Sequence, residues 1–216
     1  MRKVICVLKT GGWEAHGRKV FYTEKHVKWM QRQVEKHAPD APFVCLSNID
    51  IPGVDVIPLE HDWPGWWAKM ELFRLDIGPV LYLDLDMVIT GPLDELMNHP
   101  HEFSSKHNSG KSHTSMNSSV MLWSGPRPDI YDPFIADPQR WMRECADKRC
   151  WGDQGFIERH VTHWDCIEDL FPGAVVSYKL DVRRSKTRKP RPETRIVSFH
   201  GKPKPWEVQH DWVPKC

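Results

Sequence analysis

The chain has 216 residues, of which 40% are hydrophobic and 27% charged, and its formal net charge is +1. This length and composition fit one folded domain and exclude wholesale disorder. The near-neutral charge gives no global reason to expect a nucleic acid or an anionic membrane as partner. No apolar run approaches the roughly 18 residues that span a bilayer, and the one near residue 4 is too short for a secretory signal, so we expect a cytoplasmic protein.

The first half of the chain alternates strand-like and helix-like patterns. In chain order they predict a strand at Val4–Leu8, a helix capped by Thr23 and running to His37, strands at Phe43–Leu46 and Val54–Leu59, a helix at Ala68–Leu75 and a strand at Val80–Leu83. Alternation of this kind favours a mostly parallel sheet covered on both faces. We therefore expect an α/β fold with a Rossmann-like, mixed and mostly parallel sheet flanked by helices.

The second half is more mixed. It predicts a strand at Ser119–Trp123, helices at Pro138–Ala146 and Asp153–His160, and a late strand at Ile196–Phe199. The segment Lys179–Arg195 is basic and proline-containing, which favours an exposed loop, with a lid or an anionic acceptor site as the alternative. With no repeat or linker in view, we expect a single domain over residues 1–216.

Two residue types stand out by their number or placement. The six cysteines have no repeated pair spacing and two fall in apolar runs, which favours free thiols over disulfides. Many of the 11 tryptophans lie near glycine or proline, where flat rings can line a sugar site, although packing is the favoured role for any single one. The cysteines are Cys6, Cys45, Cys145, Cys150, Cys166 and Cys216.

Two carboxylates end the strand at Val80–Leu83. Asp84 and Asp86, two residues apart, point to the same side of the chain at the carboxyl end of a buried strand, where α/β sheets bind ligands. Carboxylate oxygens suit a hard divalent cation such as Mn²⁺ or Mg²⁺, which keeps open positions for substrate phosphates. An isolated acidic pair is often only solvated, but the apolar residues on both sides of this one strengthen the metal-site interpretation.

Four motifs occur in order along the chain: WWAKMELFR, LYLDLDMVI, MNSSVMLW and WGDQGFIE, followed by FHGKPKPW. In this order and spacing they resemble the family 8 glycosyltransferases, a retaining group with a GT-A fold that includes glycogenin and bacterial lipooligosaccharide galactosyltransferases. The resemblance covers roughly residues 4 to 206. It implies a nucleotide-binding half over about residues 1–90 and a sugar and acceptor half over about residues 91–216.

The resemblance also implies roles for individual residues. Asp84 and Asp86, with Leu85 between them, would contact the metal and the donor ribose, and Lys69 would face the donor phosphates or sugar. Asn117, Asp153 and Gln154 would lie around the transferred sugar. For Asp153 the alternative is a helix N-cap, and both roles are compatible. Near the nucleotide the resemblance places Lys9, Thr10 and Gly11, whose alternative is an ordinary strand-end turn.

The HGKPKPW segment departs from the family in one place. Gly201 and Lys204 match, with Lys204 suited to pair with the leaving diphosphate. The family's metal-binding histidine stands three residues before the glycine, where this chain has Ser198. His200 is the nearest histidine, and since residues two apart on a strand share a face, we assign the metal site to His200, with Ser198 as the alternative.

The predicted function is transfer of a hexose, with retention, from a nucleotide-diphosphate sugar, most simply a UDP-sugar, to an unidentified glycan, lipid-linked or protein acceptor. LYLDLDMVI also satisfies the motif of haloacid-dehalogenase-type phosphatases. In that family the motif opens the domain, whereas here a strand, a helix and further strands precede it. A non-catalytic carbohydrate-binding protein is the other alternative. A nucleotidyltransferase should have a glycine-rich phosphate loop with Arg or Lys after the first strand, and Lys9–Gly12 is only a faint version of it.

Overall fold

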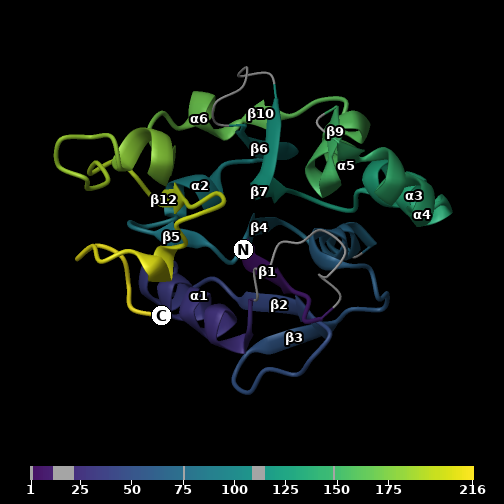
Figure 1. Cartoon of the computed structure of the whole chain (residues 1–216), viewed down its shortest axis with the longest axis horizontal. Coiled ribbons are helices and arrows are strands. Elements are labelled where there is room, and N and C mark those ends of the chain that lie inside the picture. Colours follow the sequence, from purple (N-terminus) through teal and green to yellow (C-terminus); the bar gives the residue numbers. More distant parts are fainter. Residues whose placement is uncertain (1, 12–21, 75, 109–114, 148) are drawn as a thin grey trace.

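A seven-stranded mixed sheet forms the centre of the computed structural model, which describes residues 2–11, 22–74, 76–108, 115–147 and 149–216. Its strand order is β10-β6-β7-β4-β1-β2-β3 (Figure 1). The strands are β1 (Lys3–Leu8), β2 (Phe43–Ser47), β3 (Asp55–Pro58), β4 (Val80–Leu83), β6 (Phe103–His107), β7 (Met116–Trp123) and β10 (Asp165–Cys166). Only β7 runs antiparallel to its neighbours, β4 and β6, so the predicted mostly parallel sheet is confirmed.

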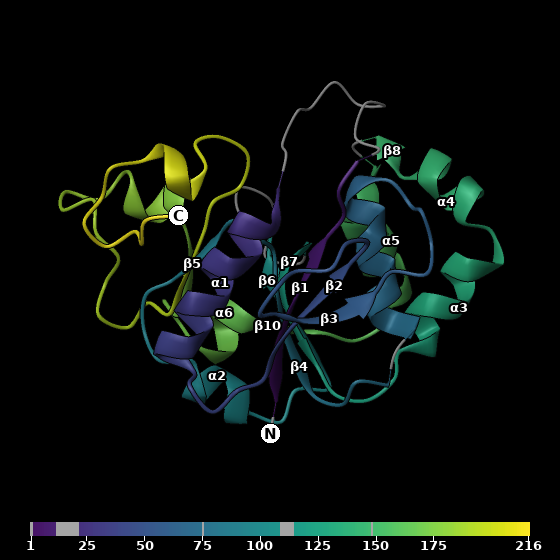
Figure 2. The same cartoon turned by 90° about the horizontal axis from the view of Figure 1, so that it is seen from below.

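Helices cover both faces of this sheet (Figure 2). On one face lie α1 (Glu24–His37), α2 (Asp94–Asn98) and α6 (Ile167–Leu170), and on the other lie the 3₁₀ helix η2 (Gly65–Arg74), α3 (Pro128–Ala136), α4 (Pro138–Glu144) and α5 (Gly152–His160). The alternation of side chains along β1 explains the two layers, because Val4, Cys6 and Leu8 join the α1 core while Ile5 joins the η2 core. This near-continuous apolar strand is typical of a sheet buried on both sides.

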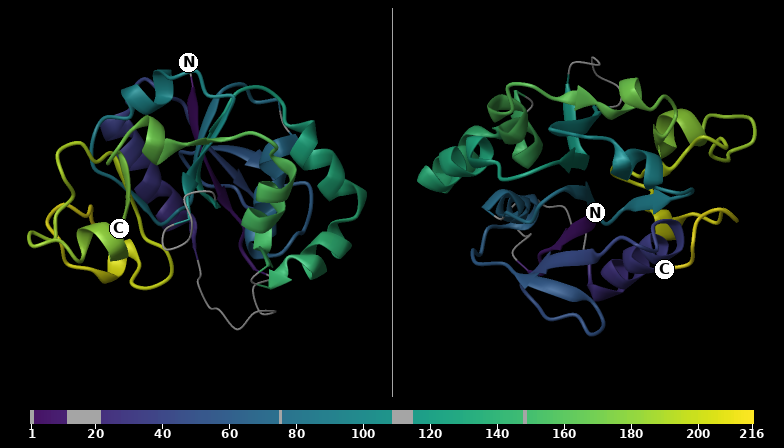
Figure 3. Two further views of the ribbon diagram at one scale, coloured as in Figure 1. Left: turned by 90° about the horizontal axis from the view of Figure 1, so that it is seen from above. Right: turned by 180° about the vertical axis from the view of Figure 1, so that it is seen from behind.

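A smaller sheet carries the last part of the chain. It has the order β11-β12-β5, formed by β11 (Val175–Ser177), β12 (Ile196–Ser198) and β5 (Met87–Ile89). Because β5 starts directly after Asp86 and pairs antiparallel with β12, with Met87 opposite Ser198, the C-terminal segment is brought beside the acidic pair. That segment also contains the π-helical turn η3 (Tyr178–Val182) and the 3₁₀ turn η4 (Pro205–Glu207), and it packs along α1, as Figure 3 shows.

The expectation of free thiols was wrong for one pair. A short hairpin of β8 (Ala146–Asp147) and β9 (Cys150–Trp151) brings Cys145 and Cys150 together, and they form a disulfide. The two cysteines are only five positions apart, and the reversal of the chain between them supplies the proximity that sequence spacing does not reveal. The other four cysteines are free.

Other expectations differ from the structure in detail. The helix expected at Ala68–Leu75 starts earlier, at Gly65, and is 3₁₀ rather than α. With three residues per turn, Trp66 and Lys69 fall on the same side, and nearly all the rest of η2 is buried, so packing rather than an amphipathic pattern sets its geometry. The exposed loop expected at Lys179–Arg195 is wrong at its start, because Lys179–Val182 belong to η3 and Val182 is buried, whereas most of the segment 183–195 is exposed. No helix in the described ranges has the length and apolar character needed to cross a bilayer.

Candidate active site

The acidic pair lies at the carboxyl end of β4, in the middle of the sheet. After Leu83 the chain turns, with the Asp84 N–H donating to Ser119 O at 2.9 Å and the Met87 N–H to Asp84 O at 3.2 Å. Both carboxylates line a cavity of about 850 Å³. Asp86 is buried, and the Asp84 side chain is one-third exposed. A strand end opening into a cavity is where an open α/β sheet binds its ligands.

The cavity gathers most of the residues that the motifs pointed to. Those that line it are Lys9, Lys69, Asp84, Leu85, Asp86, Asn117, Asp153, Gln154, Ser198, His200, Gly201 and Lys204. Thr10 and Gly11 do not line it. Instead, the Thr10 N–H donates to Asn48 Oδ1 at 2.8 Å, which holds the end of β1 against the loop after β2. Gly12 lies outside the described residues.

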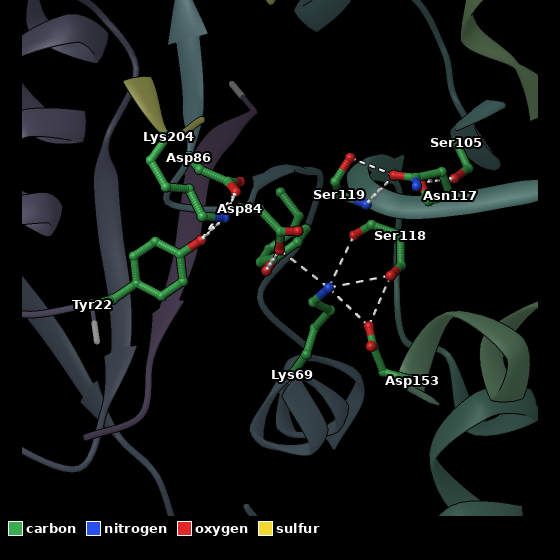
Figure 4. Close-up of polar contacts among 11 residues, drawn as sticks. Tyr22, Lys69, Asp84, Asp86, Ser105, Asn117, Ser118, Ser119, Asp153 and Lys204 are labelled. Atoms are coloured by element: carbon green, nitrogen blue, oxygen red, sulfur yellow. Dashed lines mark hydrogen bonds and ion pairs between the residues drawn. The ribbon is translucent and has the colours of Figure 1, made fainter. Parts of the chain in front are cut away.

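Lys69 is the centre of one polar network (Figure 4). Its Nζ lies 2.8 Å from Asp153 Oδ2 and 3.1 Å from Asp84 Oδ1, and it donates to the carbonyl and hydroxyl oxygens of Ser118, both at 3.2 Å. Burial alone would lower the pKa of Lys69, but the carboxylates of Asp153 and Asp84 outweigh it and hold the pKa above its ordinary value. The Lys69 side chain is therefore protonated and forms ion pairs with both Asp84 and Asp153.

Asp153 does not cap a helix. Helix α5 begins at Gly152, with Trp151 at the N-cap position, so Asp153 lies inside the first turn. Its buried carboxylate points to Lys69 and accepts a hydrogen bond from the Ser118 hydroxyl at 2.8 Å. The predicted helix, Asp153–His160, starts one residue too late, because a glycine favours a loop over a helix start.

Lys204 forms a second network on the opposite side of the cavity (Figure 4). Its Nζ lies 2.5 Å from Asp86 Oδ2 and 3.0 Å from the Tyr22 hydroxyl, which itself donates to Asp86 Oδ2 at 3.0 Å. Burial raises the pKa of Asp86, the charge of Lys204 opposes this, and Asp84 adds to it, so the pKa stays above its ordinary value. Burial together with Asp86 and Asp84 also raises the pKa of Tyr22.

Sequence reasoning missed the polar partners of these residues. Tyr82 was assigned only to a buried strand, yet its hydroxyl donates to Asp84 Oδ1 at 2.5 Å. Its position two residues before Asp84 gives both side chains the same face, a signal that was available. Asn117 lines the cavity, where its Oδ1 accepts from the Ser119 N–H at 3.1 Å and from the Ser119 hydroxyl. Ser118 and Ser119 were not predicted as site residues, because they lie in the strand β7, most of whose other residues are apolar.

Both candidates for the third metal ligand line the cavity. His200 Nε2 lies 2.9 Å from the Ser177 hydroxyl oxygen, and Ser198 is buried in β12. Burial lowers the pKa of His200, and the nearby cations of Lys179, Lys106 and Lys204 lower it further. The imidazole is therefore neutral at physiological pH, which is the form that ligates metals. The choice of His200 over Ser198 remains a prediction.

The donor set fits a divalent cation. Asp84 and Asp86 present hard oxygen donors to one cavity, and each already holds an ammonium group: Lys69 on Asp84 and Lys204 on Asp86. Within the described residues, no hydrogen bond or ion pair reaches Asp84 Oδ2 or Asp86 Oδ1. Each carboxylate thus binds one ammonium group and has a second oxygen that could ligate a metal ion.

The fold has close counterparts among solved structures. The glycosyltransferase GlyE of Streptococcus pneumoniae TIGR4 is 16% identical with a TM-score of 0.61, covering 95% of this chain and 57% of GlyE. The galactosyltransferase LgtC, solved with donor and acceptor sugar analogs, is 14% identical with a TM-score of 0.59, covering 94% of this chain and 89% of LgtC. The fold is that of a GT-A glycosyltransferase.

The likeness in sequence is weaker than the likeness in fold. No protein-family model and no curated protein sequence matches the chain. The bifunctional glycosyltransferase WbbM is 12% identical with a TM-score of 0.58, and the match covers 95% of this chain but 46% of WbbM. The chain thus spans little more than half the length of GlyE and less of WbbM, while it spans most of LgtC. The structural similarity, at TM-scores of 0.58 to 0.61, shows the GT-A fold.

A second polar cluster lies apart from the cavity lining. His107 Nδ1 is 2.8 Å from Glu168 Oε1, the His107 N–H donates to Glu168 Oε2 at 3.0 Å, and the Cys166 thiol donates to the same oxygen at 3.4 Å. Their side-chain ligand atoms lie within 4.8 Å of one another. Because Glu168 is already engaged by these donors and by the Lys106 ammonium at 3.7 Å, the cluster ties α6 to β6.

Proposed function

We propose that this protein transfers a hexose from a nucleoside-diphosphate sugar, most simply a UDP-sugar, to an acceptor hydroxyl. The observation that carries the proposal is the convergence, in one cavity of a GT-A fold, of the Asp84 and Asp86 pair with the Asp153–Gln154 pair. The first pair suits a metal and a diphosphate, and the second suits a sugar.

On the diphosphate side, Asp84, Asp86 and His200 would hold Mn²⁺ or Mg²⁺. The metal would neutralise the charge that develops on the departing diphosphate. Lys204 and Gly201 lie at the same part of the cavity, where an ammonium and a glycine backbone favour phosphate oxygens. Lys9 and Leu85, also in the lining, are the candidates to face the nucleoside. Residues up to about 90 thus serve the nucleotide, with the C-terminal segment closing the phosphate side.

On the sugar side, Asp153 and Gln154 are the candidates for assisting the reaction. Lys69 holds the Asp153 carboxylate in place, so that this carboxylate can stabilise the positive charge that develops on the sugar ring. Gln154 and Asn117 offer amides for sugar hydroxyls. An active-site mutant of LgtC replaces a glutamine by glutamate, and Gln154 is the glutamine in this cavity lining. Transfer with retention is the stereochemical proposal, and NMR of the product anomer tests it.

The decisive experiment combines binding and turnover. Calorimetry with UDP, GDP and their sugars, in Mn²⁺, Mg²⁺ or EDTA, is followed by measurement of nucleotide release. We expect metal-dependent binding of one nucleotide and slow hydrolysis of its sugar. Asp84→Asn and Asp86→Asn should each abolish metal-dependent turnover while the protein stays folded, and Asp211→Asn, on an exposed carboxylate paired with Lys189, should not. If the protein binds no nucleotide and hydrolyses p-nitrophenyl phosphate, the proposal is wrong and the protein is a phosphatase of the haloacid-dehalogenase type.

A further inference from the structure

Two tryptophans lie together on the wall of the cavity. Trp66 from η2 and Trp151 from β9 both line it, with ring centroids 6.1 Å apart and an angle of 39° between the ring planes. Trp151 is 41% exposed, whereas the core residues Trp29, Trp67 and Trp123 are at most 3% exposed. A tryptophan with this exposed fraction, on the wall of a polar cavity, points to a ligand.

The backbone around Trp151 is shaped to hold this pair. The Cys145–Cys150 disulfide closes the hairpin that carries Trp151, and the Gly152 N–H donates to Cys145 O at 2.7 Å. Gly152 has φ +59°, and a Cβ atom there would lie only 2.7 Å from Trp66 Nε1. Glycine is thus needed both for the turn and for the close approach of the Trp66 ring. A pair of rings fixed in advance loses little conformational entropy when a ligand binds.

The tryptophan pair belongs to the sugar side of the cavity. Trp151 is two residues before Asp153, and Trp66 is one 3₁₀ turn before Lys69. Figure 4 shows Lys69 and Asp153 on the side away from Lys204. With the diphosphate held at Lys204, as proposed above, the transferred sugar extends toward Asp153, and the rings stand where the acceptor has to approach it.

We infer that Trp66 and Trp151 form an acceptor subsite that stacks against a pyranose ring, so that the acceptor is a saccharide. This inference rests on the proposed function. Indole faces pack against the apolar C–H face of a sugar ring, and the neighbouring Gln154 amide offers hydrogen bonds to its hydroxyls. Lys69 and Asp153, which line the same cavity, form an ion pair with each other, which favours an uncharged sugar over an ionic acceptor.

The test measures saccharide binding separately from nucleotide binding. Saturation-transfer NMR uses methyl β-galactopyranoside, methyl α-glucopyranoside and lactose, each with and without UDP and Mn²⁺. In the wild-type protein we expect saturation of the ring C–H protons of at least one sugar. Trp151→Ala and Trp66→Ala should weaken its binding about threefold to tenfold, the range of one aromatic contact. Trp151→Phe should retain most of it.

Calorimetry with UDP and Mn²⁺ supplies the matched readout, and Trp141→Phe, at a partly buried ring outside the cavity lining, is the control. Unchanged UDP affinity in the alanine variants supports the acceptor subsite. Loss of UDP affinity with unchanged sugar binding would assign the rings to the nucleotide base and overturn the inference. Failure of the wild-type protein to bind any of the three sugars would overturn it too, whereas failure to bind UDP while sugar binding depends on Trp151 would overturn only the proposed transfer.

Discussion

The charged side chains of the cavity depend on one another because they are buried. Lys69 is 5% exposed and Asp153 is 6% exposed, so neither charge is stabilised by bulk water. The two groups lie 2.8 Å apart, Ser118 donates to the Asp153 carboxylate, and Asp84 lies 3.1 Å from Lys69 as a second ionic partner. Removing Lys69 leaves the buried Asp153 carboxylate without the cation it is paired with.

Lys69→Met should therefore destabilise the fold by about 3–5 kcal/mol, the cost of breaking a buried ion pair from one side. Urea unfolding of the variant and of the wild-type protein measures this loss. Lys25→Met, on the exposed face of α1, is the control, and an equal loss in the two variants would contradict the argument.

Sequence reasoning found the residues of the cavity better than their contacts. Asp84, Asp86, Lys69 and Asp153 were predicted because each sits in a short motif whose order is recognisable. Tyr22 was not, since its contact with Lys204 joins positions 182 apart and no local pattern encodes it. Motifs identify reactive side chains, while the partners that set their charge come from packing.

At the level of elements, His101 joins α2 to β6. Its Nε2 lies 2.8 Å from Leu96 O and its Nδ1 lies 2.6 Å from the Ser104 hydroxyl, in a site where the side chain is buried. A carbonyl only accepts, so Nε2 carries the proton and Nδ1 accepts from Ser104. Burial, aided by the charges of Arg2 and His99, lowers the pKa of His101 to about 4.

This lowered pKa makes stability depend on pH in a defined direction. Since the unfolded chain takes up the proton near pH 6.5 and the folded protein only near pH 4, stability is present above about pH 6.5 and is lost as the pH falls toward 4. We expect a loss of about 2 kcal/mol from His101 between about pH 7 and 5. Urea unfolding of His101→Gln should show a smaller loss over this range, and an identical pH profile would refute the assignment.

The β8–β9 hairpin should depend on its disulfide. Closing a loop of this length is worth about 2 kcal/mol in the chain-entropy model. The double variant Cys145→Ser with Cys150→Ser should lose that amount in chemical unfolding. Dithiothreitol provides the internal control, because it should lower the stability of the wild-type protein toward that of the variant and leave the variant unchanged. A wild-type protein insensitive to reductant would show that the hairpin is held by its packing alone.

Elements differed in how well sequence predicted them. The strands β1, β2 and β4 were expected because central parallel strands are continuous apolar runs bounded by polar residues. Strands β5, β8, β9, β10 and β11 have two or three residues each, too few for any periodic signal, and were missed, as were β6, α2, α3 and α6. Among the missed elements, β9 carries Trp151 to the cavity and β5 pairs with the C-terminal segment.

For the whole molecule, the cavity lies between segments from both ends of the chain, so a ligand there should stabilise the entire fold. A ligand at about 100 times its dissociation constant adds about 2.7 kcal/mol, which is a rise of about 5–10 °C in melting temperature for this size of protein. We expect this rise with UDP and Mn²⁺ together. EDTA, or the variant Asp86→Asn, should remove most of it, and an equal rise in EDTA would show that no metal takes part.

The fold class was predictable at this scale and the assembly of the cavity was not. Alternating strands and helices in residues 4–83 already favour an α/β sheet, whereas the antiparallel pairing of β12 with β5 joins segments more than 100 residues apart. That pairing decides which side chains of the C-terminal segment face Asp86.

The contact between Lys204 and Asp86 has a consequence for the order of events in binding. A cation arriving at Asp86 contends with the Lys204 ammonium for the same carboxylate, so the metal alone should bind weakly. A diphosphate that attracts Lys204 away from Asp86 removes this competitor. Metal and nucleotide should consequently strengthen each other's binding by the same factor, as thermodynamic reciprocity requires, and the protein should hold neither firmly until both are present.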